Sequence, residues 1–152
     1  DARIKHGIMP WNSGQLYLSP VSELRRIQRR EYYRLKIDLD AYIRQQLPED
    51  NAGDEEWMNV STVDISDGGV LLRSPEPLPP QTKVECIICL YEKNRIHVNG
   101  EVVDLYEKLG DILPYQIHIS FTDISDDVRD KVISFVFREQ QRRRWNEANT
   151  AL

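Results

Sequence analysis

The sequence has few cysteines that could form disulfide bonds and lacks a hydrophobic segment long enough to span a membrane. Two cysteines in 152 residues are too few for a disulfide framework, and such sparse use favours a reducing compartment. No run of 18 apolar residues occurs, so we expect no membrane insertion. The hydrophobic share of 40% and the aromatic share of 9% are typical of a globular chain rather than a disordered or fibrous one.

Catalytic and metal-binding patterns are also missing from the sequence. Its three histidines, His6, His97 and His118, include no pair four residues apart, and no G-x-S-x-G, P-loop or H-E-x-x-H motif occurs. Cys86 and Cys89 form a C-x-x-C pair in a strand-like stretch, where residues three apart point to opposite faces. No second pair or nearby histidine completes a zinc site. We therefore predict that the protein is not an enzyme and that it has neither a metal site nor a cofactor.

Charge is unevenly distributed along the chain. Residues 25–34 carry five arginines and one glutamate, and residues 138–144 carry four arginines and one glutamate. These clusters hold net charges of +4 and +3, so the rest of the chain must carry −12 to give the total of −5. An acidic body repels a long polyanion, so we expect no DNA or RNA partner. A compact arginine cluster can still hold a small anion.

The periodicity of apolar residues predicts the fold class. Alternation with period two favours strands at 33–39, 57–65, 70–73, 83–91, 96–106 and 115–121. After about residue 122 the period becomes helical, and we expect a helix over about 126–147, capped by Ser125 and packed through one face: Val128, Val132, Phe135 and Val136. The sequence therefore predicts a mainly β protein, a six-stranded antiparallel β-barrel with a C-terminal α-helix.

The first 28 residues differ from the rest in composition. They contain two glycines and two prolines between short apolar stretches, and the chain starts at Asp1 rather than at Met. We expect residues 1–28 to be a linker or the remnant of an upstream domain.

Two short motifs stand out. Arg30 and Arg34 lie four apart at the entry to the first expected strand, and Asp64-Ile65-Ser66-Asp67-Gly68-Gly69 lies at a turn between strands. Each alone is weak, because a solvated arginine segment and an Asx-type turn are ordinary features. Together and in this order, R-x-x-x-R followed by D-x-S-x-x-G, they resemble the PilZ family, and most of all its flagellar-brake (YcgR-like) members. The resemblance implies a split-barrel-like PilZ domain over residues 29–148.

PilZ domains bind the bacterial second messenger cyclic di-GMP, so the resemblance implies a ligand-binding set of Arg29, Arg30, Arg34, Asp64, Ser66 and Gly69. An arginine fork can meet guanine O6 and N7 with two hydrogen bonds, and its plane can stack on a purine. Asp64 would accept from guanine N1–H and N2–H. Ser66 would bond the base or orient Asp64, and Gly69 would allow a turn or a close approach.

The resemblance also implies stoichiometry, partners and location. An arginine immediately before R-x-x-x-R, here Arg29, accompanies binding of two stacked ligands in the family, so we expect an intercalated cyclic di-GMP dimer. Ligand would order the arginine-rich linker at residues 22–34 and change motility or biofilm output through a protein effector such as the flagellar motor. The protein would be cytoplasmic and bacterial. His118 stands where the family often has glycine, and we expect it to affect local packing.

A second function stays open: a non-catalytic small β-barrel that serves as a protein-interaction or RNA-binding module. Barrels of that kind bind RNA through exposed aromatic residues on a basic sheet face. Here the three tryptophans are dispersed and the body is acidic, which disfavours this alternative.

Overall fold

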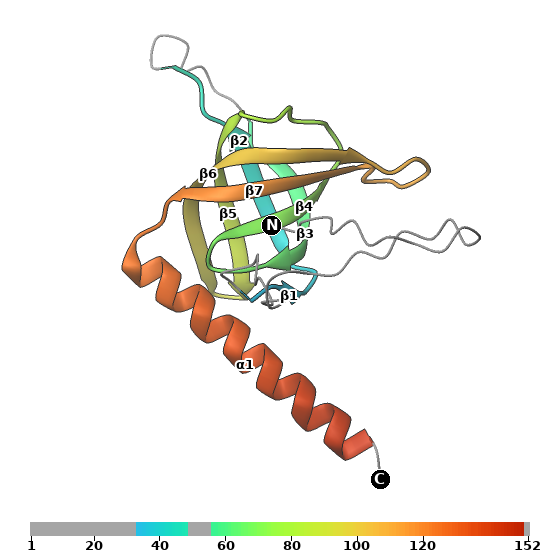
Figure 1. The fold of residues 1–152 in the computed structure, drawn as a ribbon, viewed down its shortest axis with the longest axis vertical. Coiled ribbons are helices and arrows are strands. Elements are labelled where there is room, and N and C mark those ends of the chain that lie inside the picture. Colours follow the sequence, from blue (N-terminus) through green and yellow to red (C-terminus); the bar gives the residue numbers. More distant parts are fainter. Residues whose placement is uncertain (1–32, 49–55, 151–152) are drawn as a thin grey trace, which may run out of the picture. The chain divides into compact units, whose positions relative to one another are not determined.

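The computed structural model of the chain describes residues 33–48 and 56–150, and these form seven strands and one helix (Figure 1). The strands are β1 (Leu35–Lys36), β2 (Asp40–Gln45), β3 (Met58–Ile65), β4 (Gly69–Ser74), β5 (Lys83–Tyr91), β6 (Asn94–Glu107) and β7 (Tyr115–Asp123). The helix α1 spans Asp126–Thr150. This confirms a mainly β protein with a C-terminal helix.

Six of the strands close a barrel. All their pairings are antiparallel and follow the order β3-β2-β5-β6-β7-β4, and β4 returns to pair with β3. The predicted six-stranded antiparallel barrel is therefore confirmed. The seventh strand, β1, pairs with the end of β3 through Leu35 opposite Ile65 and Lys36 opposite Asp64. Both β1 and β2 pair with the same edge of β3: β1 pairs with its last two residues, and β2 pairs with its first four, Met58–Ser61.

The start of the barrel differs from the sequence prediction. In place of one strand over 33–39, the structure has the two-residue β1, a bend at 37–39, and the strand β2, which the sequence interpretation missed. The buried hydroxyl of Thr62 supports the bend, because it donates to the carbonyl of Ile37 at 2.6 Å and accepts from the N–H of Leu39 at 2.9 Å. A side chain distant in sequence thus replaces part of the strand ladder.

The barrel interior is filled by alternate residues of the strands. Fully buried members include Ile43, Leu72, Ile88, Ile117 and Ile119. Along β5 the buried positions alternate with half-buried ones, so Cys86 points into the core and Cys89 to the outer face, as predicted. The strand pattern therefore assigns the C-x-x-C pair to opposite faces of one strand.

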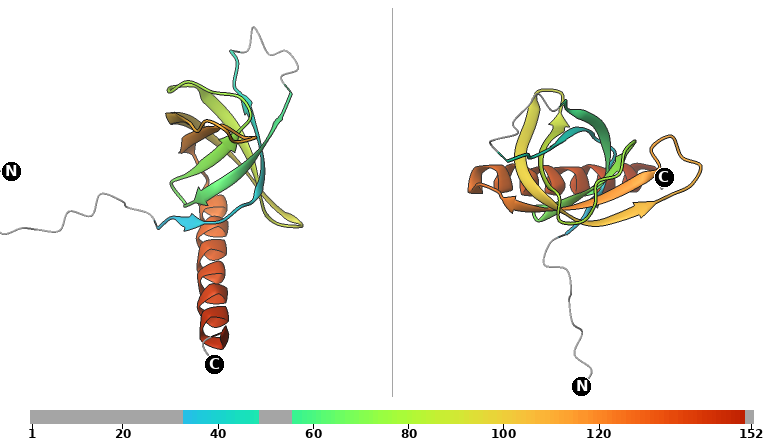
Figure 2. Two further views of the ribbon diagram at one scale, coloured as in Figure 1. Left: turned by 90° about the vertical axis from the view of Figure 1, so that its right-hand side faces the viewer. Right: turned by 90° about the horizontal axis from the view of Figure 1, so that it is seen from above.

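Helix α1 covers one end of the barrel with its first half (Figure 2). Ser125 caps it by accepting from the N–H of Val128 at 3.3 Å, and Asp126 and Asp127 occupy the first turn, where carboxylates favour the helix dipole. Val132, Phe135 and Val136 are buried, and Val128 packs beside them. The predicted cap and packing face are confirmed. No helix in the described ranges is long and apolar enough to span a membrane.

Candidate functional site

The D-x-S-x-x-G motif forms the tight turn between β3 and β4. The Ser66 N–H donates to the carbonyl of Gly69 at 2.9 Å, and the Ser66 hydroxyl accepts from the N–H of Gly68 at 3.2 Å. Gly68 in turn accepts from the N–H of Phe121 at 3.0 Å, which fixes the turn to β7. Ser66 is buried, so its hydroxyl holds the turn in shape. Among the described residues it makes no hydrogen bond to Asp64.

Gly69 is required by the packing of β4 on β7. A Cβ built on Gly69 would overlap the carbonyl oxygen of Ile119 and lie 3.4 Å from the Cα of Ser120. Both neighbours are backbone atoms of a paired strand, which cannot turn aside as a flexible side chain can. The missing side chain therefore brings the turn close to β7.

A β-bulge determines where Asp64 points. Thr62 lies opposite Leu72, but Asp64 lies opposite the next residue, Leu71, so β3 contains one extra residue at Val63. Because side chains alternate along a strand, Val60 and Thr62 point inward, and without the bulge Asp64 would follow them. The extra residue sends Asp64 outward and returns Ile65 to the core. The bulge thus places a carboxylate on the outer face beside the turn.

Arg34 lies next to this turn. Leu35 pairs with Ile65 and Lys36 with Asp64, so Arg34 comes directly before the paired segment, at the end of β3 where the turn begins. Leu35 is buried, so its neighbours Arg34 and Lys36 share the outer face. Of the predicted site residues, the structure therefore brings Arg34 together with Asp64, Ser66 and Gly69. Arg29 and Arg30 lie outside the described residues.

A row of side chains crosses the outer face at Asp64. Pairing in register runs from Lys36 to Asp64, then Leu71, His118 and Asp104, over the strands β1, β3, β4, β7 and β6. The Nδ1 atom of His118 lies 3.8 Å from a carboxylate oxygen of Asp104. His118 is thus on the same face as Asp64, two strands away. The sequence interpretation did not include Lys36 and Leu71 in the site. Lys36 could have been found, because side chains two residues apart in a strand share a face and Lys36 is two residues after Arg34.

Helix α1 also reaches this corner of the barrel. The guanidinium of Arg143 donates to the backbone carbonyl of Lys36. Its neighbour Arg142 is held differently, since its Nη2 atom lies 2.8 Å from the carboxylate of Glu139, and that hydrogen bond raises the Arg142 pKa. No local signal in the sequence could have distinguished these two arginines.

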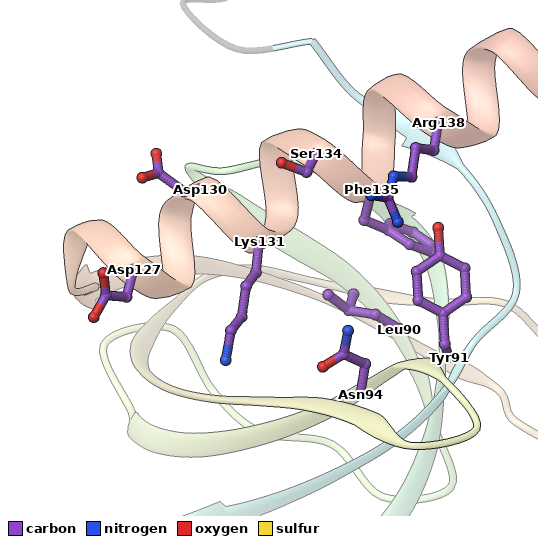
Figure 3. Close-up of a pocket in the computed structure, with 9 residues that line it drawn as sticks. All are labelled: Leu90, Tyr91, Asn94, Asp127, Asp130, Lys131, Ser134, Phe135 and Arg138. Carbon is purple, nitrogen blue, oxygen red and sulfur yellow. The ribbon is translucent and has the colours of Figure 1, made fainter.

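A separate cavity of about 440 Å³ lies between α1 and the β5–β6 turn (Figure 3). The rings of Tyr91 and Phe135 meet edge to face at 5.0 Å at one end, and Lys131 extends toward the turn that carries Asn94. Basic and acidic side chains both line the cavity, the acids being Asp127 and Asp130. Such a mixed lining suits a phosphate-bearing ligand poorly, and none of the motif residues belongs to it.

Within the described ranges, no group of histidine, cysteine and carboxylate side chains is arranged to hold a metal ion. The fold and the corner at Asp64 define a small closed β-barrel domain with a polar, partly cationic surface at one corner of its outside.

A family model described as PilZ domain matches residues 28–138, and the chain belongs to the PilZ domain family. No curated protein matches the chain.

Solved structures agree in fold. The inhibitor of motility MotI/DgrA of Bacillus subtilis is 21% identical with a TM-score of 0.62, and the match covers 84% of this chain and 58% of that one. YcgR of Escherichia coli in complex with c-di-GMP is 16% identical with a TM-score of 0.63, covering 83% and 52%. The isolated PilZ domain of YcgR with c-di-GMP is 17% identical with a TM-score of 0.63, covering 80% and 98%. The chain thus spans little more than half the length of MotI/DgrA and of whole YcgR.

Proposed function

We propose that this chain is a receptor for cyclic di-GMP and not an enzyme. The observation that carries the proposal is that β1, directly after Arg34, pairs with the end of β3 that bears the bulge-directed Asp64, in a chain that belongs to the PilZ family. The solved YcgR structures, whole and as an isolated domain, contain c-di-GMP, and they share this fold. Residues 29–148 act as the receptor domain, and residues 1–28 are a linker or the remnant of an upstream domain.

The ligand contacts follow from complementary chemistry. Arg30 and Arg34 pair with guanine O6 and N7, stack on the bases and neutralise phosphate charge. The outward carboxylate of Asp64 accepts from guanine N1–H and N2–H, an edge that offers only donors. Ser66 and Gly69 act indirectly, because they hold the turn that presents Asp64. Arg29 supports a second, stacked molecule of the messenger.

A thermal-shift panel tests this function. Cyclic di-GMP should raise the melting temperature by mass action, whereas cyclic di-AMP and a short RNA should not. A chain indifferent to cyclic di-GMP at micromolar concentration would refute the proposal. Titration calorimetry then gives the stoichiometry. Two ligands per chain would support the intercalated dimer, and one ligand per chain at saturation would refute it.

Ligand binding is transmitted to a protein effector through ordering of the arginine-rich segment at residues 22–34. Five clustered arginines repel one another, and a ligand with two phosphates removes this repulsion, so the segment closes over the corner at Asp64. Anything upstream of this segment is reoriented, and a protein effector in the bacterial cytoplasm, the flagellar motor first, responds with altered motility or biofilm formation. The B. subtilis relative MotI/DgrA is an inhibitor of motility, which supports this choice. Hydrogen exchange should show amides of residues 22–34 protected only with ligand; equal exchange with and without ligand contradicts this mechanism.

Protein interaction is the second candidate function. Phe137 and Trp145 on α1 are 56% and 69% exposed, and binding of a partner protein to α1 would bury them. In the panel above, the RNA-binding form of this alternative would give a melting shift with RNA alone. The protein-interaction form gives no shift with any nucleotide.

A further inference from the structure

The hydrogen bond between α1 and β1 joins two parts of the chain that the sequence keeps 107 residues apart. Arg143 comes from the last third of α1, and its acceptor is the carbonyl of Lys36. Lys36 lies opposite Asp64 and two residues after Arg34. The late arginine cluster therefore reaches the corner where the proposed cyclic di-GMP site lies.

The charge of Arg143 is not matched by an acid in the described part of the chain. Its acceptor is a neutral carbonyl, and the ion pairs of the described residues include none to Arg143. Arg142, one residue earlier, is neutralised by Glu139, which is itself buried. A guanidinium has five N–H donors, so the bond to Lys36 leaves most of them available to an anion. The same helix thus carries one arginine that is paired with an acid and one that, among the described residues, is not.

Like charges gather at this corner. The side chains of Arg34 and Lys36 share the outer face, and the guanidinium of Arg143 donates to the backbone carbonyl of Lys36 itself. The carboxylate of Asp64, opposite Lys36, offsets one of these three charges, and the remaining excess of positive charge favours an anion. A ligand with two phosphates supplies such an anion, and guanidinium forms strong paired hydrogen bonds with phosphate oxygens.

We propose that Arg143 is a further ligand-binding residue of this site and that it contacts a phosphate of cyclic di-GMP from α1. The inference rests on the proposed function. It makes the terminal helix a wall of the site as well as the cover of the barrel, so that the ligand touches both ends of the domain's sequence.

Titration calorimetry of the 152-residue chain with cyclic di-GMP tests this assignment. Arg143→Ala should weaken binding roughly 10-fold or more, the range for hydrogen bonds to charged groups. The matched control is Arg144→Ala, which removes the same charge one residue along the helix, about 100° away. It should leave affinity within about twofold, as surface substitutions do.

Two further variants distinguish ligand contact from a purely structural bond. Arg143→Gln keeps an N–H donor but loses the charge, and we expect it to bind as weakly as Arg143→Ala. Arg143→Lys keeps the charge and should retain most of the affinity. The affinity of the wild type should also fall more steeply with added salt than that of Arg143→Gln. The variant lacks one charged contact to the ligand, so salt has less attraction to screen.

The outcomes separate this inference from the function on which it rests. If Arg143→Gln binds as well as the wild type while Arg34→Ala binds weakly, the inference is overturned and the receptor function stands. If the wild type itself shows no binding, the receptor function fails. If Arg144→Ala weakens binding as much as Arg143→Ala, the effect is one of general charge, and the specific contact is overturned.

Discussion

The hydroxyl of Thr62 donates a 2.6 Å hydrogen bond to the carbonyl of Ile37, 25 residues away in the sequence. The same hydroxyl accepts from the N–H of Leu39 at 2.9 Å, so one buried side chain holds the bend between β1 and β2. That bend positions Arg34 and Lys36 along the end of β3. A residue outside both motifs thus helps to build the candidate site.

Thr62→Val should destabilise the fold, because it leaves the carbonyl of Ile37 and the N–H of Leu39 without their partner at almost unchanged side-chain volume. We expect a loss of about 1–3 kcal/mol in the free energy of unfolding, measured by urea denaturation. Thr62→Ser is the control: it keeps the hydroxyl and should lose only about 1 kcal/mol for the buried methyl group. A valine variant more stable than the serine variant would contradict this role.

Gly69→Ala should also destabilise the domain, since the new Cβ would overlap the carbonyl of Ile119 in the paired strand. The expected loss is about 1–3 kcal/mol, the range for overpacking. Asn59→Ala, at an exposed position of β3, serves as the control and should change stability by less than about 0.5 kcal/mol. Equal melting temperatures for wild type and Gly69→Ala would show that β7 can move away.

Arg30→Ala and Arg34→Ala should each weaken cyclic di-GMP binding by about 1–3 kcal/mol, the range for bidentate contacts to guanine. Titration calorimetry measures both. Each variant should keep the melting temperature of the ligand-free chain within a degree or so of the wild type, since surface substitutions rarely change stability by more than about 0.5 kcal/mol. Unchanged affinity in both variants would remove these arginines from the site.

Asp64→Ala should reduce the preference for guanine over adenine. In the proposed complex the carboxylate accepts from two guanine donors, so its loss should weaken cyclic di-GMP binding by about 1.5–3 kcal/mol and should not change the response to cyclic di-AMP. Asp67→Ala removes an equal charge from the same turn and is the matched control. The idea fails if the two variants lose the same affinity, because the effect would then come from general charge.

Burial raises the pKa of the Cys86 thiol to about 12, with a smaller contribution from Glu85, against 9.0 for an unperturbed thiol. The folded chain therefore keeps this proton in a range where the unfolded chain loses it. The contribution of Cys86 to stability is complete below pH 9 and declines as the pH rises toward 12, by up to about 1.4 kcal/mol per pH unit.

Urea denaturation in the alkaline range measures this decline. Cys86→Ala lacks the thiol but shares the tyrosines and lysines that also titrate there, so the difference between the two chains isolates Cys86. A wild type and a variant with parallel pH dependence would show that the thiol titrates normally.

Much of the molecule was predictable because its signals are local. Strands such as β5 and β7 reveal themselves by alternation, and α1 by its cap at Ser125 and its apolar spacing. The interval between the two motifs indicated the family. The division of 33–39 from β2 was not predictable, because the bend depends on the hydroxyl of Thr62, and alternation alone cannot distinguish one strand from two.

By itself, the sequence determined the fold class, the arginine pair and the turn motif, since periodicity and motif spacing act over a few residues. Only the tertiary structure decided which way Asp64 points, which strand lies beside Arg34, and which late arginine reaches that corner. The physical reason is that a bulge exists only in the pairing of two strands, and it is this pairing that changes the face to which the following side chains point. A helix likewise brings a side chain to a site only through the packing that fixes its direction.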